Sequence, residues 1–125
     1  ELGTGEMVRR LGGVHRDSVF DVAVNDKFLV TGSTDYTVKG WDRSALQPIQ
    51  VLEGIMGPVN AVGLMEEYVI TAPAGYRIKI WPLSDWTCIR TIVASERGIT
   101  TLSLPPSASR IISASLDNTI RIHDI

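Results

Sequence analysis

The sequence predicts an all-β fold built from three similar units, and three observations lead to this prediction. Short segments recur at intervals of about forty residues: Val30-Thr31-Gly32, Ile70-Thr71-Ala72 and Ile112-Ser113-Ala114. Within each unit apolar and polar residues alternate with a period of two, and β-branched residues are frequent. The three- and four-residue apolar spacing that is typical of helices is absent.

Further positions keep the same interval along the chain. The repeat is shared by two more sets of residues, which are Val19, Val59 and Ile99, and Trp41, Trp81 and His123. The last interval is two residues longer, and the extra residues fall between Leu104 and Ser113. The run from Pro105 to Ser109 predicts a longer turn there, where an insertion costs little stability.

Each unit is expected to contain four short strands. In the first unit, residues 19–24, 28–31 and 37–41 have the alternation and composition of strands, and Asn25-Asp26-Lys27 predicts a tight hairpin between the first two. Four short strands in about forty residues are typical of one blade of a β-propeller.

Composition narrows the classes of partner. The chain has 125 residues, of which 44% are hydrophobic, enough to form a folded core. Its formal charge of −2 disfavours nucleic acid as a partner. No apolar run approaches the roughly 20 residues that span a bilayer, and we expect no membrane partner. The single cysteine, Cys88, cannot close an intrachain disulfide, which indicates an intracellular protein, cytoplasmic or nuclear.

The first unit closely resembles a WD40 repeat. Val14-His15 stands for the usual Gly-His, and the segment from Asp35 to Asp42 ends in the typical Trp-Asp pair. The resemblance extends over nearly the whole chain. It implies a structural hydrogen-bonded chain of four side chains in this unit: His15, Thr31, Asp35 and Trp41.

The other two units depart from this pattern. In the second unit Ile55 and Gly75 replace the His and the Asp, so that Thr71 and Trp81 are left. The third unit keeps Ser113 and Asp117, with Ser95 near the His position and His123 in place of the Trp. The resemblance therefore implies a complete network in the first unit only.

The order of the strands matches the phase in which WD40 propellers close their ring. We expect residues 1–5 to be a vector-derived or disordered leader, and residues 6–125 to be WD40 repeats. Within them we expect an outer strand at 6–11, blades at 15–53 and 55–93, and the strands of a last blade at 95–125.

Three blades' worth of strands do not easily make a ring, because propellers have about 4–8 blades. Two interpretations stay open. We favour part of a longer propeller, whose remaining blades are missing, over half of a six-bladed assembly of two chains. In either case the end blades would expose apolar faces, so we expect the isolated chain to associate, as a homo-oligomer if no other blades are present.

The resemblance implies a protein–protein interaction scaffold that binds peptides or domains on one face of the propeller. Carried over residue by residue, this face would contain Ser18, Phe20, Thr34, Asn60, Thr100 and Leu116, with Arg16, Tyr36, Tyr76 and Arg77 in nearby turns. Phe20 and Leu116 are apolar at positions that face a partner, although Phe20 could instead pack between blades. The arginines favour an acidic or phosphorylated peptide, or are simply solvated.

The sequence favours binding over catalysis. A triad of Thr31, His15 and Asp35 can be written, but the structural network already explains that grouping. The glycine runs lack the context of a phosphate loop, and Glu66-Glu67 reads as a solvated turn. We therefore expect no catalytic residue, no metal and no cofactor. The alternative function is a self-assembling propeller module that forms a homo-oligomeric ring, and a propeller enzyme is the remote alternative.

Overall fold

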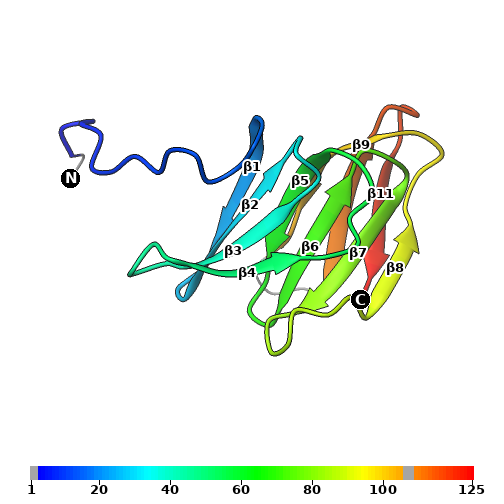
Figure 1. Cartoon of the computed structure of the whole chain (residues 1–125). Coiled ribbons are helices and arrows are strands. Elements are labelled where there is room, and N and C mark those ends of the chain that lie inside the picture. The colour runs from blue at the N-terminus through cyan, green and yellow to red at the C-terminus, as the bar shows by residue number, and fades with distance from the viewer. Residues whose placement is uncertain (1–2, 106–108) are drawn as a thin grey trace.

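The computed structural model describes residues 3–105 and 109–125, and within these residues it contains eleven strands and no helix. The strands form three antiparallel sheets that stand side by side (Figure 1). The predicted all-β fold, with three successive blades, is confirmed. Residues 106–108 of the predicted longer turn lie outside the described part of the chain.

Each blade is a meander in which consecutive strands pair. Blade 1 contains β1 (Val19–Val24), β2 (Phe28–Ser33), β3 (Val38–Asp42) and β4 (Pro48–Leu52). Blade 2 contains β5 (Val59–Leu64), β6 (Tyr68–Pro73), β7 (Arg77–Pro82) and β8 (Arg90–Val93). Blade 3 contains β9 (Ile99–Ser103), β10 (Arg110–Ser115) and β11 (Ile120–Asp124). Two blades therefore have four strands, and the third has three within the described residues.

The hairpin predicted at Asn25 is present and is fixed by its own side chain. The Asn25 side-chain oxygen accepts hydrogen bonds from the backbone amides of Lys27 (2.9 Å) and Phe28 (2.8 Å). An asparagine that bonds the backbone two and three residues on reproduces a backbone turn. The reversal between β1 and β2 is thus encoded locally.

The hydrophobic core lies between the blades. β5 lies between β1 and β9, and the sheets pack face to face (Figure 1). Between blades 1 and 2 the buried residues include Val30, Val38, Leu52, Ile55, Val59, Val62, Val69 and Trp81. Between blades 2 and 3 they include Ala61, Ile70, Ala72, Ile78, Ile80, Ala94, Ile99 and Ile111. Each blade is therefore stabilised by its neighbour.

Close approach of blades 1 and 2 depends on glycine. A β-carbon added at Gly32 would lie 2.7 Å from the Val59 side chain and 2.9 Å from that of Val62. One added at Gly40 would lie 2.6 Å from the ring of Trp86, whose backbone is left-handed with φ 59°. Large side chains of one blade thus pack directly on the backbone of the preceding one.

The outer strand expected at residues 6–11 does not form in the structure. Residues 6–10 are exposed, and the segment runs away from blade 1 at the end of the molecule opposite β11 (Figure 1). A strand needs a sheet edge to pair with, and β11 lies two blades away. Pairing of this segment with an edge outside its own chain therefore stays a prediction.

We predict that Gly32→Ala destabilises the fold by about 1–3 kcal/mol, because the new methyl group overpacks a buried contact. Gly75→Ala is the matched control, since the nearest atom to its added β-carbon is a carbonyl oxygen at 4.0 Å. Thermal melts of both variants check this. Equal melting temperatures would contradict the tight packing of blade 2 on Gly32.

Candidate functional site

A continuous hydrogen-bonded chain of side chains in blade 1 runs from Trp41 in β3 to Asp35 in the β2–β3 turn. The Trp41 indole N–H donates to Thr31 Oγ1 (3.0 Å), and Thr31 Oγ1 lies 2.7 Å from His15 Nε2. His15 Nδ1 lies 3.0 Å from Asp35 Oδ2. Every donor in this chain finds an acceptor when Nδ1 carries the imidazole proton. The structure thus brings together the four residues that the resemblance implied.

Thr37 is a further member of the network that the sequence analysis missed. Its hydroxyl and its amide both donate to Asp35 Oδ1, at 2.6 and 2.9 Å, and the Arg16 amide donates to Oδ2 at 2.9 Å. The Asp-x-Thr spacing, which recurs at Asp117 and Thr119, is the signal that could have shown it. The intervening residues, Tyr36 and Asn118, both adopt positive φ.

These contacts decide the charge of Asp35, whose side chain is 5% exposed. Burial alone would raise the pKa of this carboxyl group. Hydrogen bonds from the Thr37 hydroxyl, the Arg16 amide, His15 and the Thr37 amide outweigh burial and hold the pKa far below its ordinary value. The carboxylate is therefore charged at neutral pH and holds two turns of the blade together.

Blade 2 keeps only the inner part of this chain. The Trp81 indole N–H donates to Thr71 Oγ1 at 3.0 Å, as in blade 1. Ile55, at the His position, is buried among apolar residues of the core instead. Apolar packing thus replaces the polar chain in this blade.

In blade 3 the residues Ser113 and Asp117 are not joined. Among the described residues, Ser113 Oγ and His123 Nε2 are buried and have no hydrogen-bond partner. Asp117 instead accepts from the Glu96 amide, from Thr119 and from Arg121. The Glu96 amide and the Thr119 hydroxyl lower the pKa of Asp117 to about 2. The turn is held as in blade 1, but its connection to the interior is broken.

The candidate partner-binding residues lie on one face of the molecule, which we call the upper face. It consists of the segments that lead into β1, β5 and β9 and the turns β2–β3, β6–β7 and β10–β11. Backbone hydrogen bonds tie each segment to its turn: Thr34 N to Ser18 O, Ala74 N to Pro58 O, and Leu116 N to Gly98 O. The upper face is therefore a row of braced loops.

Each first strand carries a bulge at the upper face, and the bulged residues are Phe20, Asn60 and Thr100. A bulge re-aims a side chain away from the regular alternation. The Asn60 amide donates to Ile99 O of the next blade (2.9 Å), and the Thr100 hydroxyl donates to Ala114 O (3.2 Å). Phe20 is 60% exposed, so it does not pack between the blades of this chain.

Aromatic, apolar and guanidinium groups lie in the turns of the upper face. Tyr36 is 55% exposed and Leu116 is 60% exposed. The Arg77 guanidinium carbon lies 5.3 Å from the centre of the Tyr76 ring, in cation–π contact, and Arg16 is exposed. Thr34 donates its hydroxyl to Ser18 O at 3.3 Å, a contact that joins the β2–β3 turn to the segment before β1. The aromatic, apolar and arginine residues among the ten candidates are thus exposed on the upper face.

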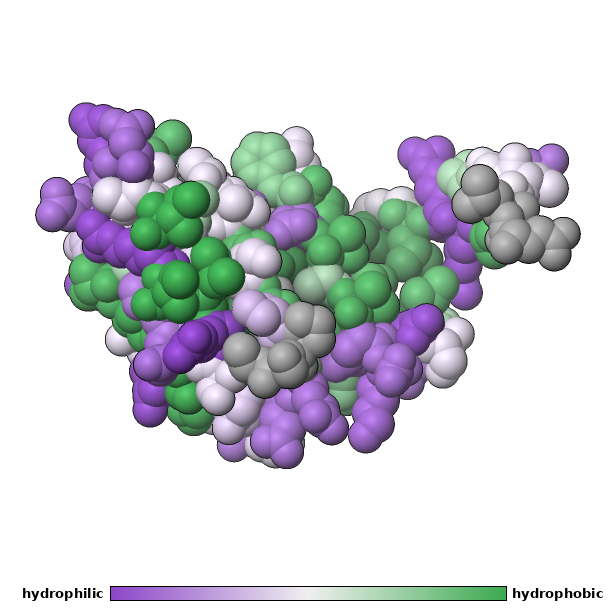
Figure 2. Space-filling model, turned by 180° about the vertical axis from the view of Figure 1, so that it is seen from behind, coloured by the Kyte–Doolittle hydropathy of each residue, from purple (hydrophilic) through white to green (hydrophobic). Residues whose placement is uncertain are grey.

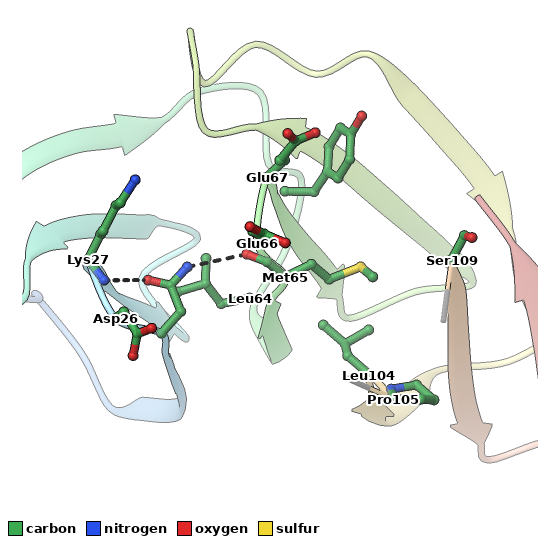
Figure 3. Close-up of a pocket in the computed structure, with 11 residues that line it drawn as sticks. Asp26, Lys27, Leu64, Met65, Glu66, Glu67, Leu104, Pro105 and Ser109 are labelled. Atoms are coloured by element: carbon green, nitrogen blue, oxygen red, sulfur yellow. Dashed lines mark hydrogen bonds between the residues drawn. The ribbon is translucent and has the colours of Figure 1, made fainter. Parts of the chain in front are cut away.

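The opposite, lower face contains a groove of about 810 Å³ between the β1–β2, β5–β6 and β9–β10 connections (Figure 3). Asn25 donates to Met65 O at 3.3 Å across its wall, which links blades 1 and 2. Glu66 and Glu67 are exposed at its rim, as a solvated turn would be.

The geometry of the His15 group does not suit a nucleophile. Thr31 Oγ1 is held between the Trp41 indole and His15, whose side chain is 1% exposed. Within residues 3–105 and 109–125 there is no group of three side chains that could hold a metal ion. The same residues include no helix able to cross a membrane.

Comparison with known proteins identifies the family. The family described as "WD domain, G-beta repeat" matches residues 5–42 and 86–124, more than half of the chain. The chain belongs to the WD40-repeat family. The first match begins ahead of blade 1, so that it takes in the segment at residues 6–11.

Several relatives share this WD40 region. The chain is 34% identical over 119 residues to nuclear distribution protein nudF of Aspergillus niger, covering 89% of this chain and 27% of the relative. It is 29% identical over 108 residues to p21-activated protein kinase-interacting protein 1-like of Gallus gallus, covering 86% and 29%. It is 28% identical over 133 aligned positions to pre-mRNA-processing factor 19 of Bos taurus, covering 100% and 26%. The WD40 chain thus spans between a quarter and a third of these relatives.

Solved structures support the same fold. The structure of U3-55K superposes with a TM-score of 0.83 at 17% identity, covering 89% of this chain and 35% of that one. The computationally designed Ika8 protein superposes with a TM-score of 0.79 at 24% identity, covering 89% and 34%. At these identities the likeness shows the fold of the WD40 chain alone.

We predict that Asp35→Ala destabilises the WD40 chain by about 2–4 kcal/mol, because His15, Thr37 and the Arg16 amide lose their acceptor. Glu66→Ala, in the exposed lower hairpin, is the control. Chemical denaturation of both variants measures the difference. Equal unfolding midpoints for the two variants would contradict the structural role assigned to Asp35.

Stability is also expected to fall in acid. A carboxyl group whose pKa is lowered on folding stabilises the fold above the pKa of the unfolded chain, and this stabilisation is lost as the pH falls. For Asp117 the loss falls between about pH 4 and pH 2, and for Asp35 it continues below that range. Asp117→Asn should flatten the curve of stability against pH in this window, and an unchanged slope would contradict the assignment.

Proposed function

We propose that this WD40 chain is a non-catalytic, intracellular protein-interaction scaffold whose upper face binds a peptide segment of a partner protein. The family membership supports the general role, and the geometry of the upper face supports the place. The buried polar network of blade 1 braces the loops rather than reacting, which favours binding over catalysis.

One observation carries the choice of site, and it is the contrast between three equivalent bulges. The side chains of Asn60 and Thr100 donate hydrogen bonds to backbone carbonyl groups, whereas Phe20 projects into solvent from the same position. Exposure of an apolar phenylalanine ring to water is unfavourable in the free protein. Burial of the ring by a partner removes this cost and so contributes to the binding free energy. Phe20 is therefore the proposed anchor of the interaction.

The surroundings indicate the chemistry of the partner. Tyr36 and Leu116 add exposed apolar groups to the turns of the upper face, and Arg16 and the stacked Arg77 offer positive charge there. Arginine pairs with carboxylate or phosphate groups through two parallel hydrogen bonds. We therefore propose a segment with an apolar residue flanked by acidic or phosphorylated residues.

We predict that Phe20→Ala weakens binding at least about tenfold while it leaves the melting temperature unchanged. The probe is a displayed library of random peptides, selected on the wild-type chain. Dissociation constants of the selected peptides are then measured for the wild type, for Phe20→Ala and for Glu66→Ala on the lower face.

Loss of affinity in Phe20→Ala alone, with an excess of apolar and acidic residues among the selected peptides, supports the proposal. Equal affinity for wild type and Phe20→Ala would overturn Phe20 as the anchor. Loss of affinity in Glu66→Ala alone would move the binding site to the lower groove.

A further inference from the structure

Blade 2 lacks a carboxylate with which both of its neighbours hold their upper turns. In blade 1 the Asp35 carboxylate accepts a hydrogen bond from the Arg16 amide at 2.9 Å. In blade 3 the Asp117 carboxylate accepts one from the Glu96 amide at 3.0 Å. Each bond joins the upper turn of a blade to the segment that leads into that blade. Gly75 stands at the equivalent position of blade 2, and it has no side chain to make this contact.

Two groups of blade 2 stand where the neighbouring blades bind their carboxylate. The Met56 amide is equivalent to the two amides just described, and it finds no acceptor in the described part of the chain. Arg77 takes the place of a threonine that donates to the aspartate in blades 1 and 3. Because β7 begins at Arg77, this side chain stands on a strand. Blade 2 thus keeps hydrogen-bond donors at these positions without the carboxylate that their counterparts bind.

The segment that leads into β5 and the β6–β7 turn lie against each other. A β-carbon added at Gly57, whose φ of 109° is left-handed, would lie 3.5 Å from Ala74 O. Ile55 is buried in the core, whereas Met56 beside it is 86% exposed. The Met56 amide therefore belongs to a surface loop that packs on the turn just before β7.

Aromatic rings hold two cations of β7 beside this loop. The Arg77 guanidinium carbon lies 5.3 Å from the centre of the Tyr76 ring. Lys79 Nζ lies 5.7 Å from the Trp81 ring and donates to Gly54 O at 2.9 Å. Arg77 and Lys79 are two residues apart on one strand, so their side chains leave it on the same side. Cation–π contact orients a cation and leaves its charge available to an anion.

Apolar groups accompany this charge on the upper face. Figure 2 shows hydrophobic and hydrophilic residues side by side along the top of the molecule, where this face lies. In blade 2 the exposed groups include Met56, Arg77 and Tyr76, which is 46% exposed. Residues 53–58 and 74–77 contain one acidic side chain, Glu53, against the two cations of β7. The balance of charge therefore favours an anionic group of a partner.

We propose that an aspartate or glutamate side chain of the partner segment supplies the carboxylate that blade 2 lacks. It accepts hydrogen bonds from the Arg77 guanidinium and the Met56 amide, and its neighbours in the segment lie on the Met56 and Tyr76 side chains. A carboxylate fits better than a phosphate, because the equivalent donors of blades 1 and 3 bind a carboxylate. The inference rests on the peptide binding proposed above, and it names the group that blade 2 recognises.

The first test uses peptides selected on the wild-type chain, in which each acidic residue is changed in turn to its amide. One such change should weaken binding to the wild type at least about tenfold. The same change should have little effect on binding to Arg77→Gln, because that variant has already lost the contact. Lys27→Gln, an equal change of charge at an exposed residue of the lower face, should keep the wild-type dependence on the peptide carboxylate.

The second test supplies the carboxylate from within the chain. A β-carbon added at Gly75 meets no atom closer than Pro73 O at 4.0 Å, so a side chain fits there. The carboxylate of Gly75→Asp should occupy Arg77 and the Met56 amide, and should weaken binding of the selected peptides at least about tenfold without lowering the melting temperature. Gly75→Asn has the same size without the charge, and should bind the peptides more tightly than Gly75→Asp.

Three results would overturn this inference. The first is a set of selected peptides whose binding depends on no carboxylate. The second is equal sensitivity of the wild type and Arg77→Gln to every amide change. The third is equal loss of affinity in Gly75→Asp and Gly75→Asn, which would show a steric effect.

The two proposals can fail separately. If Phe20→Ala abolishes binding and no peptide carboxylate matters, the upper face binds peptides but blade 2 does not recognise an acidic group. If Phe20→Ala binds like the wild type and one carboxylate still depends on Arg77, Phe20 is not the anchor and the inference on blade 2 stands.

Discussion

The packing of one blade face on the next is the contact on which the rest of this structure depends. A four-stranded sheet of this size cannot bury its own apolar side chains, because both of its faces are open. Ile70 and Ile78 are fully buried because blade 3 covers them. Val59 and Val69 are fully buried because blade 1 covers them. The middle blade is therefore the best-packed part of the chain, and its packing holds the loops of the upper face in place.

Polar and apolar interactions divide the work between the blades. In blade 1 the carboxylate of Asp35 ties the loops to the interior through His15 and Thr31. In blade 2, Ile55 supplies apolar contacts at the same place. In blade 3 neither solution is complete, since Ser113 Oγ and His123 Nε2 find no partner in the described residues. Unsatisfied buried polar groups cost stability, so these two atoms destabilise the interior of blade 3.

Much of the fold could be predicted because its signals are local and repeated. The forty-residue interval, the alternation in β1 and the turn at Asn25 are properties of short segments. Thr37 escaped because its role depends on the left-handed backbone at Tyr36, which no periodicity reveals. Asn60 and Thr100 donate to backbone carbonyl groups from bulged positions, a contact that the alternation of residues does not predict. The segment at residues 6–11 looks like a strand, yet strand formation requires an edge that its own chain does not bring near.

The replacement of tryptophan by His123 distributes the indole rings unevenly. Trp41 and Trp81 lie in blades 1 and 2, and Trp86 covers Gly40 at the contact between them, whereas blade 3 contains no tryptophan. Intrinsic tryptophan emission therefore reports on the first two blades and is blind to the last one. Far-ultraviolet circular dichroism averages over the strands of all three blades. If blade 3 unfolds before the other two, the circular dichroism signal will change at a lower denaturant concentration than the tryptophan emission.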